Sequence, residues 1–200
     1  MNILCIDPGS TKSGAAVLVD GNLDDHQWED NNTLANLLRS TKQTNAYGGI
    51  DAVVIEDVAH YGMPVGKEVF DTVKWIGRFT EAARELSVTF ISRPDVKLAL
   101  CGSPRANDST IRQAVIDHYG GDSVAIGGKK CVDCKGKGWK GRDHTVCESC
   151  HHQTVDKAHP PKCETVGCGY ETHPGQLHGV SGHVWSALAV GITYLKQLSN

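Results

Sequence analysis

The sequence predicts an α/β fold in which a mixed five-stranded sheet is flanked by helices, with a cysteine-rich zinc-binding insertion. The N-terminal part contains short apolar runs separated by a turn signal, as in antiparallel strands. After residue 50, apolar runs alternate with segments of helical periodicity, which indicates parallel strands joined by helices. Six of the eight cysteines lie between residues 131 and 168, in a segment with too few apolar residues to build a core.

Five short apolar segments predict the strands. The second and third are joined by Asp20 and Gly21, a pair that favours a tight hairpin turn. The fourth is rich in β-branched residues, as expected for a strand buried on both faces. The predicted strands are residues 2–6, 14–19, 22–28, 51–58 and 88–91.

Four segments predict helices from their apolar spacing and their end signals. Asn31 or Asn32 is expected to cap the first helix, and Asn107, Asp108 or Ser109 the third. The second helix contains Phe70, Trp75 and Phe79, which fit either a core face or part of a dimer interface, with the core preferred. The predicted helices are residues 33–42, 67–86, 111–119 and about 181–198.

Length and charge limit the organisation and the partners. A chain of 200 residues suits one main domain, predicted at 1–126 and 176–200, with an inserted module at 127–175. A net charge of -3 excludes a general polyanion binder, so any nucleic-acid contact needs a local basic patch. The N-terminus has no signal-peptide pattern and the chain has no long apolar stretch. We therefore expect a cytoplasmic protein that does not span a membrane.

Two acids occur at the ends of predicted strands. Asp7 follows an apolar strand and precedes a Pro-Gly turn, and Glu56 lies at the end of a buried strand. Each acid alone also fits a strand-end carboxylate that accepts turn hydrogen bonds. Together at neighbouring strand ends, they would repel each other unless a cation lay between them. Carboxylate oxygens suit Mg²⁺ or Mn²⁺, and such sites hydrolyse phosphodiester bonds.

Four segments resemble the RuvC-type Holliday junction resolvases of the RNase H-like superfamily, particularly their bacteriophage-encoded relatives. They are ILCIDPGSTKSGAAVL at 3–18, VVIEDVAHYGMPVGKEVFDTVKWIGRF at 53–79, CGSPRANDSTIRQAVIDHYG at 101–120 and GQLHGVSGHVWSALAVGITYL at 175–195. The resemblance implies an RNase H-like fold and a homodimeric, metal-dependent endonuclease that cuts four-way (Holliday) junctions. If the protein is phage-encoded, it implies action in the host cytoplasm.

The resemblance places the family's catalytic acids on Asp7 and Glu56 and its last metal-binding pair on His183 and Ser186. Ser186 departs from the family pattern, because two acids often occupy these positions. His183 still offers a ring nitrogen to the metal, although a histidine in a helix also fits a surface or core role. With an imidazole ligand, we expect Mn²⁺ to support activity at least as well as Mg²⁺.

The site can compensate for the absence of an acid at position 186 in two ways, or it can bind one metal less tightly. Asp57 or Asp108 supplies it from another segment, or one metal binds weakly. We favour Asp108 as a further catalytic residue, because it lies in a family-like segment. Capping of a helix is the alternative role for Asp108.

The cysteine-rich insertion predicts a structural zinc site. Two C-x-x-C pairs separated by twelve residues can close a tetrahedral Zn²⁺ site and leave no open position for catalysis. A possible second site involves Cys163 and Cys168 with histidines nearby. The four principal ligands are Cys131, Cys134, Cys147 and Cys150.

Basic residues crowd around the first cysteine pair, with Trp139 among them. We expect them to bind phosphates of a DNA arm, with Trp139 stacking on a base. Solvated lysines around a zinc site are the alternative interpretation. The residues are Lys129, Lys130, Lys135, Lys137, Lys140 and Arg142.

Three other functions fit parts of the sequence. A broader nuclease for flaps or other branched DNA would differ only in the shape of its substrate. A non-cleaving or weakly active branched-DNA-binding zinc protein is suggested by Ser186 and the cysteine-rich module. An actin-like ATPase would share the D-x-G-x-T-x-x-G pattern, but the chain lacks a second phosphate loop and is too short for two such domains.

Overall fold

The computed structural model describes residues 1–44, 49–59, 62, 64–126, 139–140, 145–146 and 175–199. The chain divides into two compact units, Met1–His118 with Gly179–Asn200, and Tyr119–His178. All six predicted zinc-ligand cysteines and all predicted DNA-binding residues except Lys140 lie outside the described residues. Lys140 lies in a two-residue strand that pairs with another one, β6 (Trp139–Lys140) with β7 (Thr145–Val146).

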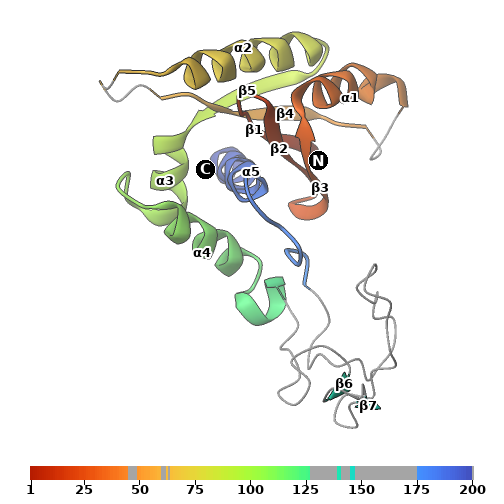
Figure 1. Ribbon diagram of the computed structural model, residues 1–200, viewed down its shortest axis with the longest axis vertical. Helices are drawn as coiled ribbons and strands as arrows, with labels where there is room; N and C mark the ends of the chain where they lie inside the picture. The colour runs from red at the N-terminus through yellow and green to blue at the C-terminus, as the bar shows by residue number, and fades with distance from the viewer. Residues whose placement is uncertain are drawn as a thin grey trace. The chain divides into compact units, whose positions relative to one another are not determined.

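The first unit is built on a mixed five-stranded sheet, as predicted (Figure 1). Its order is β3-β2-β1-β4-β5, with β1, β2 and β3 antiparallel and β1, β4 and β5 parallel. The positive φ angles of Asp20 and Gly21 confirm the predicted hairpin turn between β2 and β3. The strands are β1 (Asn2–Asp7), β2 (Lys12–Val19), β3 (Asn22–Asp30), β4 (Ala52–Asp57) and β5 (Ser87–Ser92).

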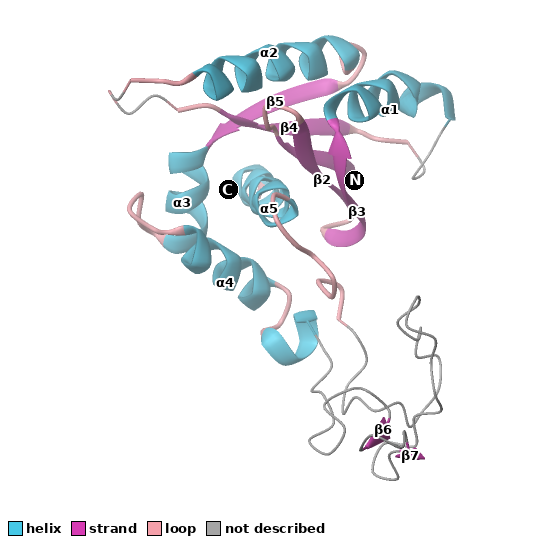
Figure 2. Ribbon diagram, viewed as in Figure 1, coloured by secondary structure: helices cyan, strands magenta, loops and turns pink. Residues whose placement is uncertain are grey.

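Helices cover both faces of this sheet (Figure 2). One face packs against α1 and α2 in a cluster that includes Leu34 and the fully buried Phe79. On the other face, α5 contacts β1, β2 and β4, and α3 and α4 pack against α5. The helices are α1 (Asn31–Thr44), α2 (Lys67–Ala82), α3 (Arg93–Cys101), α4 (Asp108–His118) and α5 (Val184–Leu198). In the second unit, Asp122–Ile126 form one turn of π-helix.

Glycines let α5 lie unusually close to the sheet. A Cβ atom at Gly14 would lie 2.5 Å from the carbonyl carbon of His183. A Cβ atom at Gly191 would collide with Cys5 and would lie 2.8 Å from Leu18. Because real Cβ atoms are not found at such distances, both glycines are needed for this packing, which fixes the start of α5 above β2.

Several helix predictions were wrong in detail. The sequence interpretation missed α3, although Ser92 caps it through the backbone N–H of Asp95 and Pro94 lies in its first turn. Helix α2 is shorter than predicted, ending at Ala82, and α5 begins at Val184. Asp30, not an asparagine, accepts a hydrogen bond from the backbone N–H of Asn32 at the start of α1.

The sequence alone did not decide whether the three aromatic residues of α2 face the core or an interface. In the structure, two of them face the core and one is exposed. Phe79 is fully buried and Trp75 packs against the core, whereas Phe70 is 56% exposed.

Among the described residues, no helix is long and apolar enough to cross a membrane.

Candidate active site

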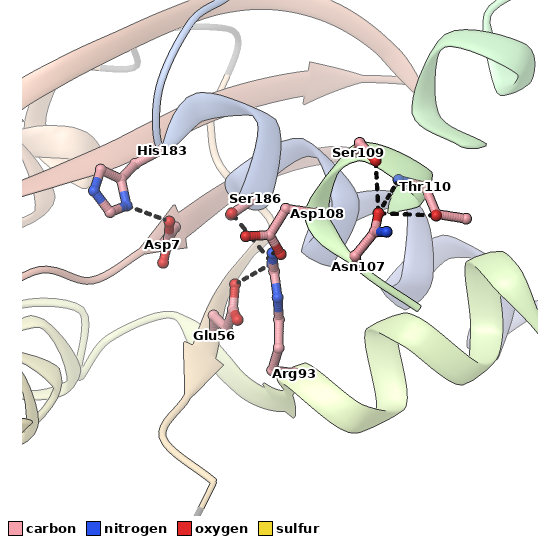
Figure 3. A network of polar contacts seen from close by, with 9 residues as sticks. All are labelled: Asp7, Glu56, Arg93, Asn107, Asp108, Ser109, Thr110, His183 and Ser186. Atoms are coloured by element: carbon pink, nitrogen blue, oxygen red, sulfur yellow. Dashed lines mark hydrogen bonds and ion pairs between the residues drawn. The ribbon is translucent and has the colours of Figure 1, made fainter. Parts of the chain in front are cut away.

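The carboxyl ends of three neighbouring parallel strands bring charged residues together (Figure 3). Asp7 is the last residue of β1, and Glu56 is the next-to-last residue of β4. Because Ile6 pairs with Ile55, the residues that follow them, Asp7 and Glu56, lie side by side. Arg93 follows β5 directly and is the first residue of α3. The side chains of Asp7 and Glu56 are only 14% and 12% exposed, so these two acids lie largely out of solvent. The side chains of His183 and Asp108 are 51% and 85% exposed, so the site is open to solvent on their side.

The loop after Asp7 is held by buried hydrogen bonds. Ser13 donates to Oδ1 of Asn31 over 2.7 Å and accepts from the backbone N–H of Gly9. Asn31 in turn donates to the carbonyl oxygen of Gly9 over 2.9 Å. Both side chains are fully buried, so this network fixes the turn beyond Asp7 and the direction of its carboxylate.

His183 occupies the position just before α5, and its side chain contacts Asp7 instead of the helix backbone. Its Nδ1 donates to Oδ2 of Asp7 over 2.7 Å, and this hydrogen bond raises the pKa of His183 against the opposing effect of burial. The contact depends on Gly14, which pairs with Asp7 across β1 and β2 and leaves room for the backbone of His183. A hydrogen bond of this kind orients the imidazole and sets which nitrogen carries the proton.

Arg93 lies at the centre of the second half of the site. One guanidinium nitrogen donates to Oε2 of Glu56 over 3.3 Å and to Oγ of Ser186 over 3.1 Å. The other terminal nitrogen donates to Oδ1 of Asp108 over 2.6 Å. Residues from β4, α4 and α5 thus meet around one guanidinium group, which is 20% exposed.

Glu56 has a strongly shifted pKa. Burial raises the pKa of this carboxyl to about 7, and the nearby carboxylates of Asp7 and Asp108 add to the shift. The positive charge of Arg93 opposes it. A buried acid that titrates near neutral pH beside other charged groups is typical of a functional site.

The structure brings together Asp7, Glu56, Asp108 and His183, the four residues predicted as catalytic. Asp108 reaches the site through Arg93, and Asn107 takes the capping role by accepting from the backbone N–H of Thr110. Asp7, Glu56 and Asp108 line a cavity of about 420 Å³. The further polar residues that line this cavity are Asp57, Thr72, Arg93 and Lys97.

The donor set suits a hard divalent cation. Carboxylate oxygens and one imidazole nitrogen fit Mg²⁺ or Mn²⁺. Within the described part of the chain, Oδ1 of Asp7 and Oε1 of Glu56 accept no hydrogen bond and remain available to a ligand. In the same part of the chain, no three His, Cys, Asp or Glu side chains converge closely enough to hold a metal as they stand. Arg93 lies between two of the acids, Glu56 and Asp108.

The sequence interpretation missed two residues near this site. Arg93 carried a signal, because it stands two residues after the predicted strand 88–91, at the strand end where functional groups of parallel sheets gather. Trp28 on β3 is 53% exposed, with its ring centroid 6.0 Å from that of His183 and the ammonium group of Lys12 5.4 Å above it. Only the pairing of β2 with β3 places Trp28 there, so no local pattern could reveal it.

Comparisons with known structures agree with the predicted fold. Neither a protein-family model nor a curated protein sequence matches the chain. RuvC of Thermus thermophilus is 16% identical with a TM-score of 0.57, over 100% of this chain and 96% of that one. The T. thermophilus RuvC in complex with Holliday junction substrate is 14% identical, again with a TM-score of 0.57, over 100% and 95% of the two chains. The chain therefore has a RuvC-like α/β fold.

Proposed function

We propose that this protein is an endonuclease that hydrolyses phosphodiester bonds in four-way junctions or other branched DNA with the help of Mg²⁺ or Mn²⁺. The observation that carries the proposal is the meeting of Asp7, Glu56, Asp108 and His183 around the carboxyl ends of β1 and β4. It is supported by the RuvC-like fold, since a solved RuvC structure is a complex with Holliday junction substrate.

The residues of the site would have different roles in this reaction. Asp7 and Glu56 would hold the cation, which supplies an activated water and stabilises the leaving oxygen. Asp7 also keeps the imidazole of His183 turned towards the site. Because the pKa of Glu56 is about 7, this carboxyl becomes fully ionised only above neutral pH. We therefore expect activity to rise with pH through the neutral range.

The choice of metal tests the role of His183. An imidazole ligand favours Mn²⁺ over the harder Mg²⁺. We expect Mn²⁺ to support cleavage at least as well as Mg²⁺ at equal concentration. A strong preference for Mg²⁺ would count against His183 as a ligand.

We propose that the cysteine-rich module binds structural Zn²⁺ and that its basic residues contact phosphates of a junction arm. Four thiolates satisfy a zinc ion and leave no position for a water. The basic residues supply the local positive patch that a chain with a net charge of -3 needs to bind DNA.

A homodimer is also part of the proposal. A four-way junction is two-fold symmetric, and two copies of the chain would present two equivalent active sites to it. Phe70 and Val73 on α2 are 56% and 49% exposed, and residues three positions apart share a helix face. We propose that a second copy of the chain covers this face.

The test uses purified protein with a labelled four-way junction, a matched duplex and a flap, in Mg²⁺ or Mn²⁺. We expect symmetric nicks in the junction that disappear in Asp7→Asn. Asp24→Asn is the matched control, because Asp24 is exposed on β3 and removes the same charge away from the site. Equal nicking by Asp7→Asn would reject the assignment of the site.

A non-cleaving branched-DNA-binding protein is the second candidate. It is favoured by Arg93, which lies among the acids, and by Ser186, which carries no charge. Tight and selective binding of the junction, with no cleavage in either metal, would support this alternative.

A further inference from the structure

We propose that Arg93 is a permanent cation of the active site and takes the place of one metal ion, so that the site binds a single divalent ion. This inference rests on the proposed function, because it concerns the cations of the same site.

The position of the guanidinium group is the first support. Arg93 contacts Glu56, Asp108 and Ser186 at once, over 3.3, 2.6 and 3.1 Å. Carboxylates gathered at one point need a cation between them. In this chain, a side chain already fills that place on the Glu56 side of the site (Figure 3).

The backbone around Arg93 is fixed, which distinguishes it from a mobile surface arginine. It is the first residue of α3, directly after β5, with Ser92 as the helix cap. Oγ of Ser92 also contacts Oδ2 of Asp95 over 2.5 Å. The side chain is only 20% exposed, so displacing it would leave Glu56 buried without its partner.

Charge balance also favours one divalent ion. Asp7, Glu56 and Asp108 carry three negative charges when ionised, and Arg93 carries one positive charge. The remaining two negative charges match one divalent ion, whereas two such ions would leave the site positive before any DNA phosphate binds. Among the described residues, Oδ1 of Asp7, Oε1 of Glu56 and Oδ2 of Asp108 accept no hydrogen bond. Asp7 is the acid of the three that Arg93 does not contact, so the ion would bind beside Asp7.

Ser186 completes the arrangement. Its hydroxyl oxygen accepts from Arg93 and adds no negative charge to the site. An acid at this position would raise the negative charge beside Glu56 and favour a second metal ion. The neutral side chain of Ser186 and the positive charge of Arg93 therefore both favour a site with a single divalent ion.

Arg93 also keeps capacity to bind substrate. A guanidinium group has five N–H donors, and the contacts with Glu56, Ser186 and Asp108 use three of them. Guanidinium groups bind phosphate oxygens well because their donors form a planar fork. The remaining donors could therefore contact a phosphodiester group of the DNA.

The experiment counts bound Mn²⁺ by electron paramagnetic resonance of the free ion, with full-length zinc-loaded protein. An alkaline buffer keeps Glu56 ionised. Ions that disappear in Asp7→Asn belong to this site, which separates them from any ion bound elsewhere. We expect one such ion in the wild type and two in the double variant Arg93→Gln with Ser186→Asp.

Single variants and a matched control sharpen the result. Arg93→Gln alone should tighten Mn²⁺ binding by at least about tenfold, because it removes a nearby positive charge. Arg93→Lys keeps that charge and should keep one ion with an affinity close to that of the wild type. Arg84→Gln removes an exposed guanidinium group that pairs with Glu81, and it should change neither number nor affinity.

Zero or two Asp7-dependent ions in the wild type would overturn the inference, as would unchanged Mn²⁺ affinity in a folded Arg93→Gln variant. Junction cleavage is measured on the same samples. Cleavage with two bound ions would reject the role of Arg93 and keep the proposed nuclease. One bound ion that responds to Arg93, without any cleavage, would support the cation assignment and reject the nuclease.

Discussion

Glu56→Gln is expected to stabilise the folded protein at alkaline pH while abolishing metal-dependent cleavage. Burial, with the nearby charges of Asp7 and Asp108, raises the pKa of Glu56 from 4.5 to about 7, although Arg93 opposes the shift. The Glu56 side chain is 12% exposed, so solvent screens little of this effect. The protein thus keeps a carboxylate where its charged form weakens the fold, as functional sites often do.

The sign and the pH window follow from proton linkage. The folded-state pKa of Glu56 lies above the unfolded value, so the folded protein binds more protons between pH 4.5 and about 7. Stability from this group is therefore full below pH 4.5 and falls as pH rises to about 7. A difference of roughly 2.5 between the two pKa values corresponds to about 3 kcal/mol.

The assay is urea unfolding followed by far-ultraviolet circular dichroism, in buffer without Mg²⁺, Mn²⁺ or chelator, so that the proposed structural zinc would be retained. Glutamine cannot ionise, so the unfolding free energy of Glu56→Gln minus that of the wild type should increase by about 2.5 kcal/mol from pH 5 to pH 8. Glu68→Gln, on the exposed start of α2, should show little dependence on pH. A difference for Glu56→Gln that stays constant, or falls, between these pH values would refute the reasoning.

Three further predictions concern packing, the insertion and assembly. Gly14→Ala should lower the melting temperature and cleavage together, because its Cβ would displace the backbone of His183; Gly77→Ala, with open space around it, is the control and should be neutral or stabilising. If the protein forms the proposed dimer, Phe70→Glu should shift it to monomer in analytical ultracentrifugation, and an unchanged dimer mass would reject α2 as the interface. Neutralising four lysines together should reduce the slope of junction affinity against salt by up to about 4, and an unchanged slope would exclude them as phosphate contacts; they are Lys129, Lys130, Lys135 and Lys137.

The sheet and its two buried acids were predictable because their signals are local. Apolar runs that end in an acid marked Asp7 and Glu56, and the parallel pairing of β1 with β4 then places the two side by side. The pairing of His183 with Asp7 spans most of the chain. The resemblance to known resolvases predicted the two residues as ligands of one metal site, but not their hydrogen bond. The structure shows this contact and its physical basis, which is the missing side chain at Gly14.

The half of the site around Arg93 was not predictable from periodicity. Helix α3 buries only Val96 fully, so its apolar spacing does not give a clear helical pattern. Its end signals were nevertheless present, with Ser92 before the helix and Gly102 in a left-handed conformation after it. The meeting of Arg93 with Asp108 depends on how α3 and α4 pack against α5, which no local pattern records.

The most direct test of the proposed nuclease is cleavage of a labelled four-way junction under single-turnover conditions, at protein concentrations where wild type and Asp7→Asn both bind the junction fully. We predict metal-dependent, symmetric nicks by the wild type and a loss of at least about 100-fold in rate for Asp7→Asn with unchanged binding. No cleavage by the wild type in Mg²⁺ or Mn²⁺, or equal cleavage by both proteins, would contradict the assignment of Asp7 and its neighbours as a nuclease site.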